Sequence, residues 1–419
     1  MRTRTFIAAI LLASSALAQE ANHLAIDAQV RSRGEYNNGA LSPRGEGERP
    51  ALFINERARL GIGYQRGAVQ LKVAAQHTCV WGQDAIKDRA GHVNMNEAWA
   101  KVKASNGLFI QAGRQQLSYD DERLLGASDW SVAGNSHDAL RLGYESEAHT
   151  VHLLASFNQM AENDRGLYYG GPMPYKAMQG VWYHYQAPRT PLGISLLALN
   201  VGKEKGEDGK GKTYNMQTLG THVTYSPQGF DFAASFYYQM GKSVIGHYEY
   251  DTGAFMASAR MGYTFVPAFK LTLGYDYLSG NDGRNTNEHA FSTLFGTHHK
   301  FYGAMDYFYA SPLSIQLNPG LQDALVTVES QMSEVVSLQL TYHYFMTAEK
   351  LSGLDKALGH EADLQLTFRL AKDATLTAGY STMLGTSSMD VLKGGNHKSW
   401  QDWAWLSLNV SPRIFSTKW

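Results

Sequence analysis

The sequence predicts an all-β protein: a transmembrane antiparallel β-barrel of about eighteen strands, with short periplasmic turns and long extracellular loops. Three observations support this fold class. Apolar and polar residues alternate with period two in many segments, and the links between these segments are alternately short and long. The chain is also rich in glycine and tyrosine, with 41 and 24 residues. Beyond the N-terminus it has no run of about 18 apolar residues, as a transmembrane helix would need, so only a closed barrel could satisfy its backbone in lipid.

The N-terminus predicts export. Arg2 and Arg4 precede a short apolar segment, and Ala16-Leu17-Ala18 has the small-residue pattern of a cleavage site. These features are typical of a secretory signal peptide. We therefore expect residues 1–18 to be removed, residues 19–419 to form a single barrel domain, and the mature protein to lie in the outer membrane.

The clearest strand is ADLQLTFRL, residues 362–370. Its even positions are apolar and its odd positions are polar, so the two kinds of residue lie on opposite faces of a strand, whereas a helix would mix them. Several apolar faces end in tyrosine, as expected where a barrel meets the membrane interface. The same alternation occurs in residues 23–33, 53–64, 337–344 and 403–410.

The links between strands predict which end of the barrel faces the periplasm. An even strand number places both termini at the end with the short turns. We expect short turns at Gln65–Ala68, Ser105–Gly107, Glu145–His149, Ala187–Pro191, Ser226–Gly229, Val266–Ala268, Met332–Glu334 and Ala371–Asp373, and longer loops at Asn37–Pro50, Val80–His92, Ser118–Ser136, Glu162–Pro174, Lys203–Lys212, Lys242–Asp251, Gly280–Gly320, Thr347–Ala357 and Gly385–Trp400. The segment Gly280–Gly320 is long enough to hold a short helix or to fold back into the lumen.

Composition excludes some functions. The formal net charge is −1, whereas a nucleic-acid-binding protein should be clearly basic. Cys79 is the single cysteine, so no internal disulfide can form. No sequence motif indicates a cofactor or a metal.

Charged residues on the polar faces are candidates for the pore lining. The predicted basic residues on strands are Arg31, Arg33, Arg57, Arg59, Lys101, Arg141, Arg260 and Arg369, and the acidic ones are Asp27, Glu97, Glu361 and Asp363. Rows of arginine facing a water-filled lumen would favour anions. Two interpretations stay open: a basic ladder facing acids on the opposite wall, or charge pairing that fills the barrel. Trp99, Trp403 and Trp405 also fall on polar faces, where they could stack against sugar rings or simply pack.

The segment GRQQLSYDDERLLGASDW, residues 113–130, concentrates acids around two arginines. Its charged residues are Arg114, Asp120, Asp121, Glu122, Arg123 and Asp129. The consecutive acids lack the alternate spacing of a calcium loop, and the chain has no G-x-S-x-G or H-E-x-x-H motif. We predict that Ser118–Ser136 folds into the lumen and that Arg123 and the acids form ion pairs against the wall.

The segment from Gly113 to Leu142 resembles the alginate export family of outer-membrane porins. The resemblance rests on Gly113-Arg114-Gln115, on the spacing within Asp121–Trp130, and on Asp138–Leu142. It implies an eighteen-stranded barrel and passive export of an anionic polysaccharide through an arginine-lined constriction. It supports Arg114, Arg123 and Arg141 as site residues. The C-terminus departs from a typical outer-membrane ending, and either Phe415 or Trp419 could serve recognition by the barrel-assembly machinery.

These observations together predict a porin-like channel for an anionic saccharide or another small anion. Its expected partners are outer-membrane lipid and the transported solute, with no nucleic acid. The alternatives are a structural or adhesive barrel plugged by its loops and, less favoured, an outer-membrane hydrolase.

Overall fold

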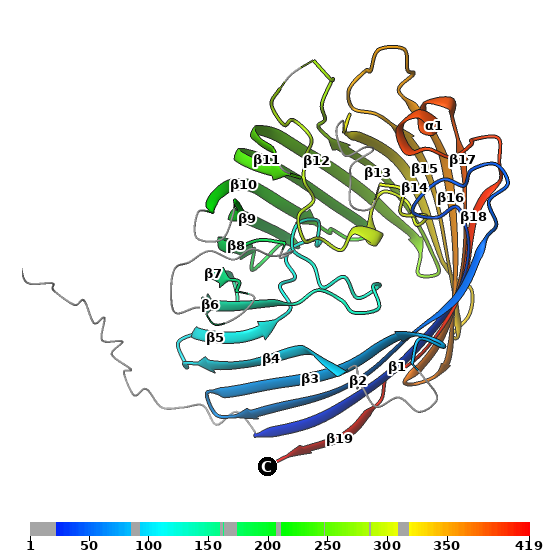
Figure 1. Ribbon diagram of the computed structural model, residues 1–419. Helices are drawn as coiled ribbons and strands as arrows, with labels where there is room; N and C mark the ends of the chain where they lie inside the picture. The colour runs from blue at the N-terminus through cyan, green and yellow to red at the C-terminus, as the bar shows by residue number, and fades with distance from the viewer. Residues whose placement is uncertain are drawn as a thin grey trace, which may run out of the picture.

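The computed structural model describes residues 22–84, 93–159, 162, 174–206, 211–246, 248–284, 286–308 and 318–419. The predicted signal peptide, residues 1–18, lies outside these ranges. Each strand pairs antiparallel with the next in the chain, and β1 pairs with both β2 and the C-terminal strands (Figure 1). The described strands therefore form one closed barrel, which confirms the predicted fold class. Among the described residues, neither helix is long and apolar enough to cross a membrane.

The C-terminal strands β18 and β19 act as one closing strand. The C-terminal part of β1, Val30–Asn38, pairs with β18, and its N-terminal part, from His23 to Asp27, pairs with β19. Pro412 separates the two segments, and its carbonyl oxygen accepts a hydrogen bond from the backbone N–H of Ala28 at 3.0 Å. The nineteen strand segments thus make a closed barrel of 18 strands.

The elements follow each other in a simple order. They are β1 His23–Asn38, β2 Ala51–Arg66, β3 Val69–Val80, β4 Val93–Lys103, β5 Leu108–Gln115, β6 His137–Glu145, β7 His149–Phe157, β8 Ala177–Gln186, β9 Leu192–Lys205, β10 Lys212–Tyr225, β11 Phe230–Ile245, β12 Tyr248–Val266, β13 Phe269–Leu278, η1 His298–Lys300, β14 Leu321–Gln331, β15 Val336–Met346, β16 Ala357–Ala371, β17 Ala374–Gly385, α1 Ser387–Lys393, β18 Gln401–Val410 and β19 Arg413–Lys418.

The period-two alternation gives the barrel an apolar outer face and a polar inner face. On β2, Leu60 and Ile62 are exposed on the outside, whereas Arg57 is buried on the inside. Aromatic rings gather near the short turns on the outer face; the rings of Phe230 and Tyr263, for example, lie 4.5 Å apart. This arrangement is typical of the interfacial girdle of a membrane barrel. Backbone hydrogen bonds between Asn22 and Trp419 hold both ends of the described chain at the same end of the barrel.

The links follow the predicted rhythm with one clear exception. We expected a loop at Lys242–Asp251, but β11 continues to Ile245 and β12 begins at Tyr248. The cross-strand pairing continues from Lys242 opposite Asp251 to Ile245 opposite Tyr248, and Lys242 Nζ lies 2.8 Å from Asp251 Oδ1 across the hairpin. The last long link holds α1, which the sequence analysis did not predict. Parts of the predicted loops Val80–His92, Glu162–Pro174, Lys203–Lys212, Lys242–Asp251 and Gly280–Gly320 lie outside the described residues.

Two long links fold into the lumen instead of staying at the rim (Figure 1). We call residues 116–136 inner loop 1 and residues 286–308 inner loop 2. They lie side by side, with a parallel bridge between Leu125 and Phe295, and the N–H of Thr297 donates to the carbonyl of Glu122 at 2.9 Å. The predicted inward fold of Ser118–Ser136 is therefore present, and residues 286–308 of the predicted link Gly280–Gly320 both fold inward and hold a short helix, η1.

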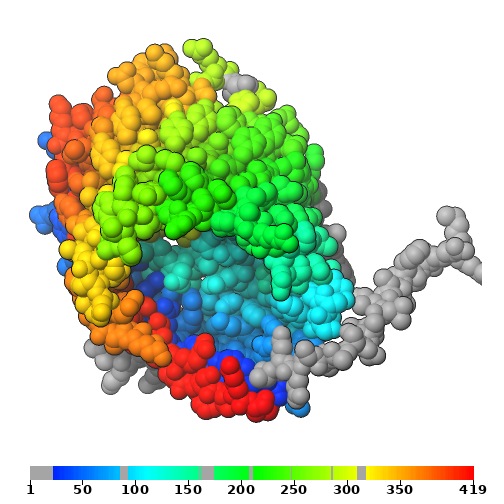
Figure 2. All heavy atoms as spheres, turned by 180° about the vertical axis from the view of Figure 1, so that it is seen from behind, coloured from blue at the N-terminus to red at the C-terminus, as the bar shows by residue number. Residues whose placement is uncertain are grey.

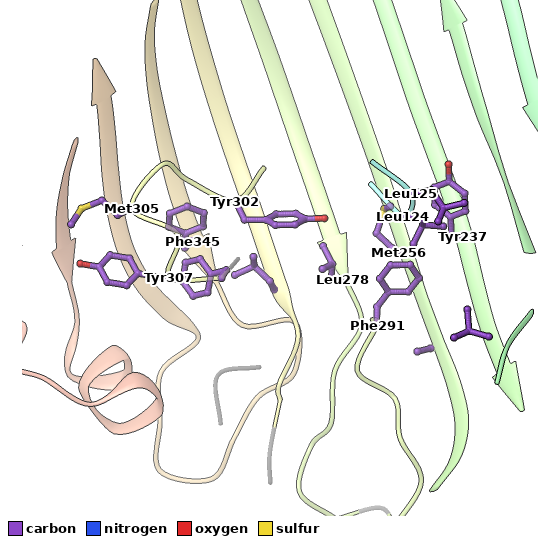
Figure 3. Packing of buried hydrophobic residues seen from close by; sticks show 14 of the residues in the cluster. Leu124, Leu125, Tyr237, Met256, Leu278, Phe291, Tyr302, Met305, Tyr307 and Phe345 are labelled. Atoms are coloured by element: carbon purple, nitrogen blue, oxygen red, sulfur yellow. The ribbon is translucent and has the colours of Figure 1, made fainter. Parts of the chain in front are cut away.

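The hydrophobic core of this barrel lies inside the lumen. Figure 3 shows side chains of both inner loops packed among residues of the wall strands. Phe291, Tyr302 and Met305 of inner loop 2 are each at most 2 % exposed. On the side of the C-terminal segment the lumen remains a deep hollow surrounded by strand ends (Figure 2). The inner loops therefore narrow the barrel partway along its axis.

Candidate functional site

Four arginines on β1 and β2 form a concentrated positive charge on the inner wall. Arg31 and Arg33 are two residues apart, as are Arg57 and Arg59, so each pair points to the same face of its strand. The antiparallel register places Arg31 opposite Arg57. We call these four residues the arginine cluster. Like charges so close together need acceptors nearby, and inner loop 1 supplies them.

Inner loop 1 presents its backbone carbonyls to the arginine cluster. Arg31 donates to the carbonyl oxygens of Asp129 at 2.7 Å and Ser131 at 2.9 Å. Arg33 donates to the carbonyl of Trp130 at 2.9 Å and also pairs with Glu35 on its own strand at 2.8 Å. The cluster therefore holds the loop mainly through neutral acceptors, which leave much of its positive charge uncompensated.

Asp129 supplies the carboxylate of inner loop 1 that faces the cluster. Its Oδ1 lies 2.8 Å from Arg57 Nη2 and 4.0 Å from Arg59 Nη1, and its Oδ2 lies 3.5 Å from Arg31 Nη1. The Asp129 side chain is 61 % exposed, whereas that of Arg57 is completely buried. Asp129 thus lies between the fixed positive wall and the water-filled part of the lumen.

Trp130 packs the loop against the adjacent wall. The Arg33 guanidinium lies 3.9 Å above its ring, and His299 of η1 stacks on it with ring centroids 4.1 Å apart. Trp403 and Trp405 meet Trp130 edge-on and are only 3 % and 8 % exposed. Both tryptophans are therefore used in packing, and their faces are not available to a passing sugar ring.

A second charged cluster ties inner loop 1 to the opposite wall. Arg123 donates to Asp121 at 2.7 Å, to Asp276 of β13 at 2.9 Å and to the Tyr302 hydroxyl at 3.1 Å. Arg260 of β12 pairs with both oxygens of Asp276, at 2.8 and 2.6 Å. Burial alone would lower the pKa of Arg123, but the carboxylate of Asp276 raises it well above the ordinary value. Arg123 stays charged, as the predicted ion pairing requires.

Acids of β16 hold inner loop 2. Glu361 accepts the backbone N–H of Met305 at 2.8 Å, and Asp363 accepts that of Ala304 at 3.3 Å. His343 lies between Asp323, at 2.9 Å, and Asp363, at 3.5 Å. Asp323 was not among the predicted site residues. The alternation of its strand shows the face on which it lies, but no local pattern shows that a histidine of the next strand covers it.

The remaining predicted residues lie apart from these clusters and mostly have local partners. Lys101 pairs with Glu145 at 3.0 Å, Arg141 donates to Gln111 at 2.6 Å, Glu97 lies 3.6 Å from Lys72, Asp27 pairs with Arg413 at 2.8 Å, Arg114 pairs with Asp138 at 3.2 Å, and Arg369 is exposed near the short-turn end of β16. Along β5, Arg114 shares the phase of the exposed Ile110 and Ala112, so it does not join the arginine cluster. The predicted charges thus form several small groups.

Two cavities of about 490 Å³ each lie on either side of η1. One is lined by His298, Tyr175 and Arg114, near the loop ends of β5 and β6, and the other by His299 and Arg260, toward the short turns. Burial lowers the pKa of His298, so this ring is neutral at neutral pH. The short helix η1 therefore separates two cavities within the lumen. We call the one on the loop side the outer cavity and the one on the short-turn side the inner cavity.

The four acids of residues 113–130 are all engaged in structural contacts. Asp120 accepts from the indole of Trp182 at 3.0 Å, Asp121 pairs with Arg123, Glu122 accepts from Ser118 at 2.5 Å, and Asp129 pairs with Arg57. Asp121 and Glu122 bind side chains of inner loop 1 itself, whereas Asp120 and Asp129 bind side chains of two different wall strands. The site is thus a constriction held together by ion pairs and by hydrogen bonds to neutral groups.

A closed eighteen-stranded barrel narrowed by inward loops, with an apolar outer face, defines an outer-membrane channel. The model of the family described as alginate export matches residues 22–384. The chain belongs to the alginate export family. Among curated proteins, none matches this sequence.

Solved structures of Pseudomonas aeruginosa outer-membrane proteins have the same fold. OccK2 (OpdF), in complex with glucuronate, is similar with a TM-score of 0.60 and 12 % identity, over 94 % of this chain and 98 % of that one. OccK11 (OpdR) has a TM-score of 0.60 and 12 % identity, over 94 % and 96 % of the two chains. OpdK with vanillate has a TM-score of 0.57 and 11 % identity, over 94 % and 99 %.

Proposed function

We propose that this protein is a passive channel for a small anionic solute, with an anionic saccharide as the favoured class. The single observation that carries the proposal is the arginine cluster, in which four guanidinium groups face the carboxylates of Glu35 and Asp129. A guanidinium fork binds carboxylates in a bidentate manner, so the cluster suits a carboxylated solute. The family description, alginate export, and the carboxylate ligands named for OccK2 and OpdK support the same solute class.

The geometry suggests how such a solute would pass. The outer and inner cavities would each hold it transiently, and η1 would mark the narrowest point between them. Near that point Arg31 and Arg59 retain 12 % and 17 % side-chain exposure, so their guanidinium groups can contact a carboxylate while Asp129 moves aside. Weak binding at several places permits release as well as entry. In this proposal the protein contributes no catalytic step.

Single-channel recording in planar bilayers tests this function. We expect discrete conductance steps and a reversal potential that indicates anion preference under a salt gradient. Replacing Arg57, Arg59 and Arg141 with glutamine should move the reversal potential toward cation preference, since each change removes a positive charge from the inner wall. An anion preference that persists unchanged in the triple variant would contradict the role of these arginines.

A plugged barrel is the second candidate, and the packing of inner loop 2 favours it. Tyr302, Phe291 and Met305 are nearly inaccessible, as in a protein core. If the loops seal the lumen, the wild-type barrel should show no conductance in bilayers, and removing the Arg123 anchor should open it. A conducting wild-type barrel would exclude this alternative.

A further inference from the structure

The outer face of β3 carries a group of side chains that the transport function does not use. His77 and Cys79 are two residues apart and therefore point to the same side of the strand. This is the outer phase, which they share with the exposed Val69, Leu71 and Val73. The chain turns just after β3, and Asp84 returns to lie 3.0 Å from His77, measured from Oδ2 to Nε2.

These three side chains bring one nitrogen, one sulfur and one oxygen donor together. Their donor atoms all lie within 4.8 Å of one another. Ligand atoms around a tetrahedral zinc ion lie about 3.3–3.6 Å apart, given Zn–S of about 2.3 Å and Zn–N or Zn–O of about 2.0 Å. Side-chain movements of about 1 Å would thus convert the group into a coordination shell.

The position of the group makes it accessible to ions. On β2 the outer face is apolar from Tyr64 to Ala58 and is interrupted at Glu56, the cross-strand partner of Cys79; beyond it Ile54 and Leu52 are the last residues of this face toward the loop. Glu56 accepts a hydrogen bond from the indole of Trp81 at 2.8 Å. A carboxylate beside an indole is typical of the membrane–water interface, because the ring tolerates the boundary and the charge requires water. The group therefore lies at the loop-side edge of the apolar belt.

We propose that His77, Cys79 and Asp84 form a binding site for one zinc ion on the outer wall of the barrel. The mixed imidazole, thiolate and carboxylate set matches the ligands that zinc prefers, and calcium or magnesium would not select the thiol. On binding, His77 coordinates through Nε2 as the neutral ring with its hydrogen on Nδ1, so a proton held between His77 and Asp84 passes to Nδ1 or to solvent, and the Cys79 thiol releases its proton to solvent. A water molecule completes the tetrahedron.

The ion would fasten the start of the β3–β4 link to the barrel wall. Asp84 is the one ligand outside the strand, and its link to His77 closes a short turn in which Gln83 N–H donates to the Val80 carbonyl at 2.9 Å. Zinc would thus give this edge of the extracellular surface a metal-dependent anchor. The site is independent of the lumen and would exist in either a conducting or a plugged barrel.

Cobalt titration of the folded, full-length mature barrel in detergent, with no affinity tag and with Cys79 reduced, tests this proposal. One equivalent of Co²⁺ should produce the thiolate-to-metal charge-transfer absorption, and Zn²⁺ should abolish it by displacement. Cys79→Ser should eliminate the absorption. His77→Ala should weaken Zn²⁺ binding by at least about tenfold, the scale on which even outer-shell changes reduce metal affinity. His360→Ala removes an exposed histidine of β16 and should leave both readouts unchanged.

Two results would overturn the site. The first is the absence of a charge-transfer band in the folded wild-type barrel. The second is an equal affinity of the wild-type and His77→Ala barrels for Zn²⁺, which would assign any binding to isolated surface groups. Circular dichroism of each variant shows that the β-structure is retained, so a lost signal reports the ligand and not unfolding.

Discussion

Asp129→Asn isolates the electrostatic role of the arginine cluster. The amide has nearly the same shape as the carboxylate, so the change removes one negative charge and little else. The loop should stay in place, because Arg31 and Arg33 bind the carbonyls of Asp129, Trp130 and Ser131, which the substitution keeps. The variant should therefore have the same pore with one more uncompensated positive charge.

The size of the effect follows from Coulomb's law. A solute charge about 8 Å from the carboxylate, at an effective dielectric constant of about 40, interacts by about 1 kcal/mol. Salt at about 0.1 M has a Debye length of about 10 Å and roughly halves this energy. Permeability to a monovalent anion should therefore rise about twofold to fivefold and permeability to a cation should fall by the same factor, so their ratio should rise at least about fivefold, with the larger value in dilute salt. The 61 % exposure of the Asp129 side chain is the reason for choosing so high a dielectric constant.

Reversal potentials across planar bilayers under a salt gradient measure this ratio directly. Asp251→Asn is a matched control: its side chain is 68 % exposed and pairs with a cation, Lys242, but it lies in the β11–β12 hairpin away from the cluster. An unchanged reversal potential in Asp129→Asn, or an equal shift in the control, would refute the reasoning, because the cluster would then not control the charge that the solute meets.

Three further perturbations test how the inner loops are held. Arg123→Met should weaken the docking of inner loop 1 by about 3–5 kcal/mol, the usual cost of removing one partner of a buried ion pair, and should raise backbone hydrogen exchange there; unchanged exchange would contradict this. Partial burial alone would raise the pKa of Glu122, but hydrogen bonds from Ser118 and Thr297 lower it below 4.5. Docking should therefore be constant at neutral pH and weaken as pH falls through this lowered value, giving channel noise at acid pH that Glu122→Gln does not show. Gly303→Ala should loosen inner loop 2, because φ is +87° and a Cβ would lie 2.6 Å from the Glu361 carboxylate; limited proteolysis with no faster cleavage would count against it.

The acids of residues 113–130 illustrate the limits of local patterns. Their density around Arg114 and Arg123 indicated a site, and the absence of catalytic motifs favoured ion pairing. The structure distributes them among partners from distant strands, such as Trp182 for Asp120 and the arginine cluster for Asp129. The sequence therefore predicted the kind of interaction but not the partner.

The sequence by itself determined the barrel. Alternation with period two assigns each strand residue to the lumen or to lipid, because successive side chains of a strand point to opposite sides, and this holds without knowledge of distant contacts. It placed Arg31, Arg57 and Arg260 on the inner wall, where the structure has them. Only the tertiary structure decided what these charges do. The acceptors of Arg31 lie about a hundred positions away in the chain, at Asp129 and Ser131, and Tyr302 meets Arg123 across an even longer separation. Such contacts depend on how two long loops pack inside a closed wall, and no local pattern encodes that packing.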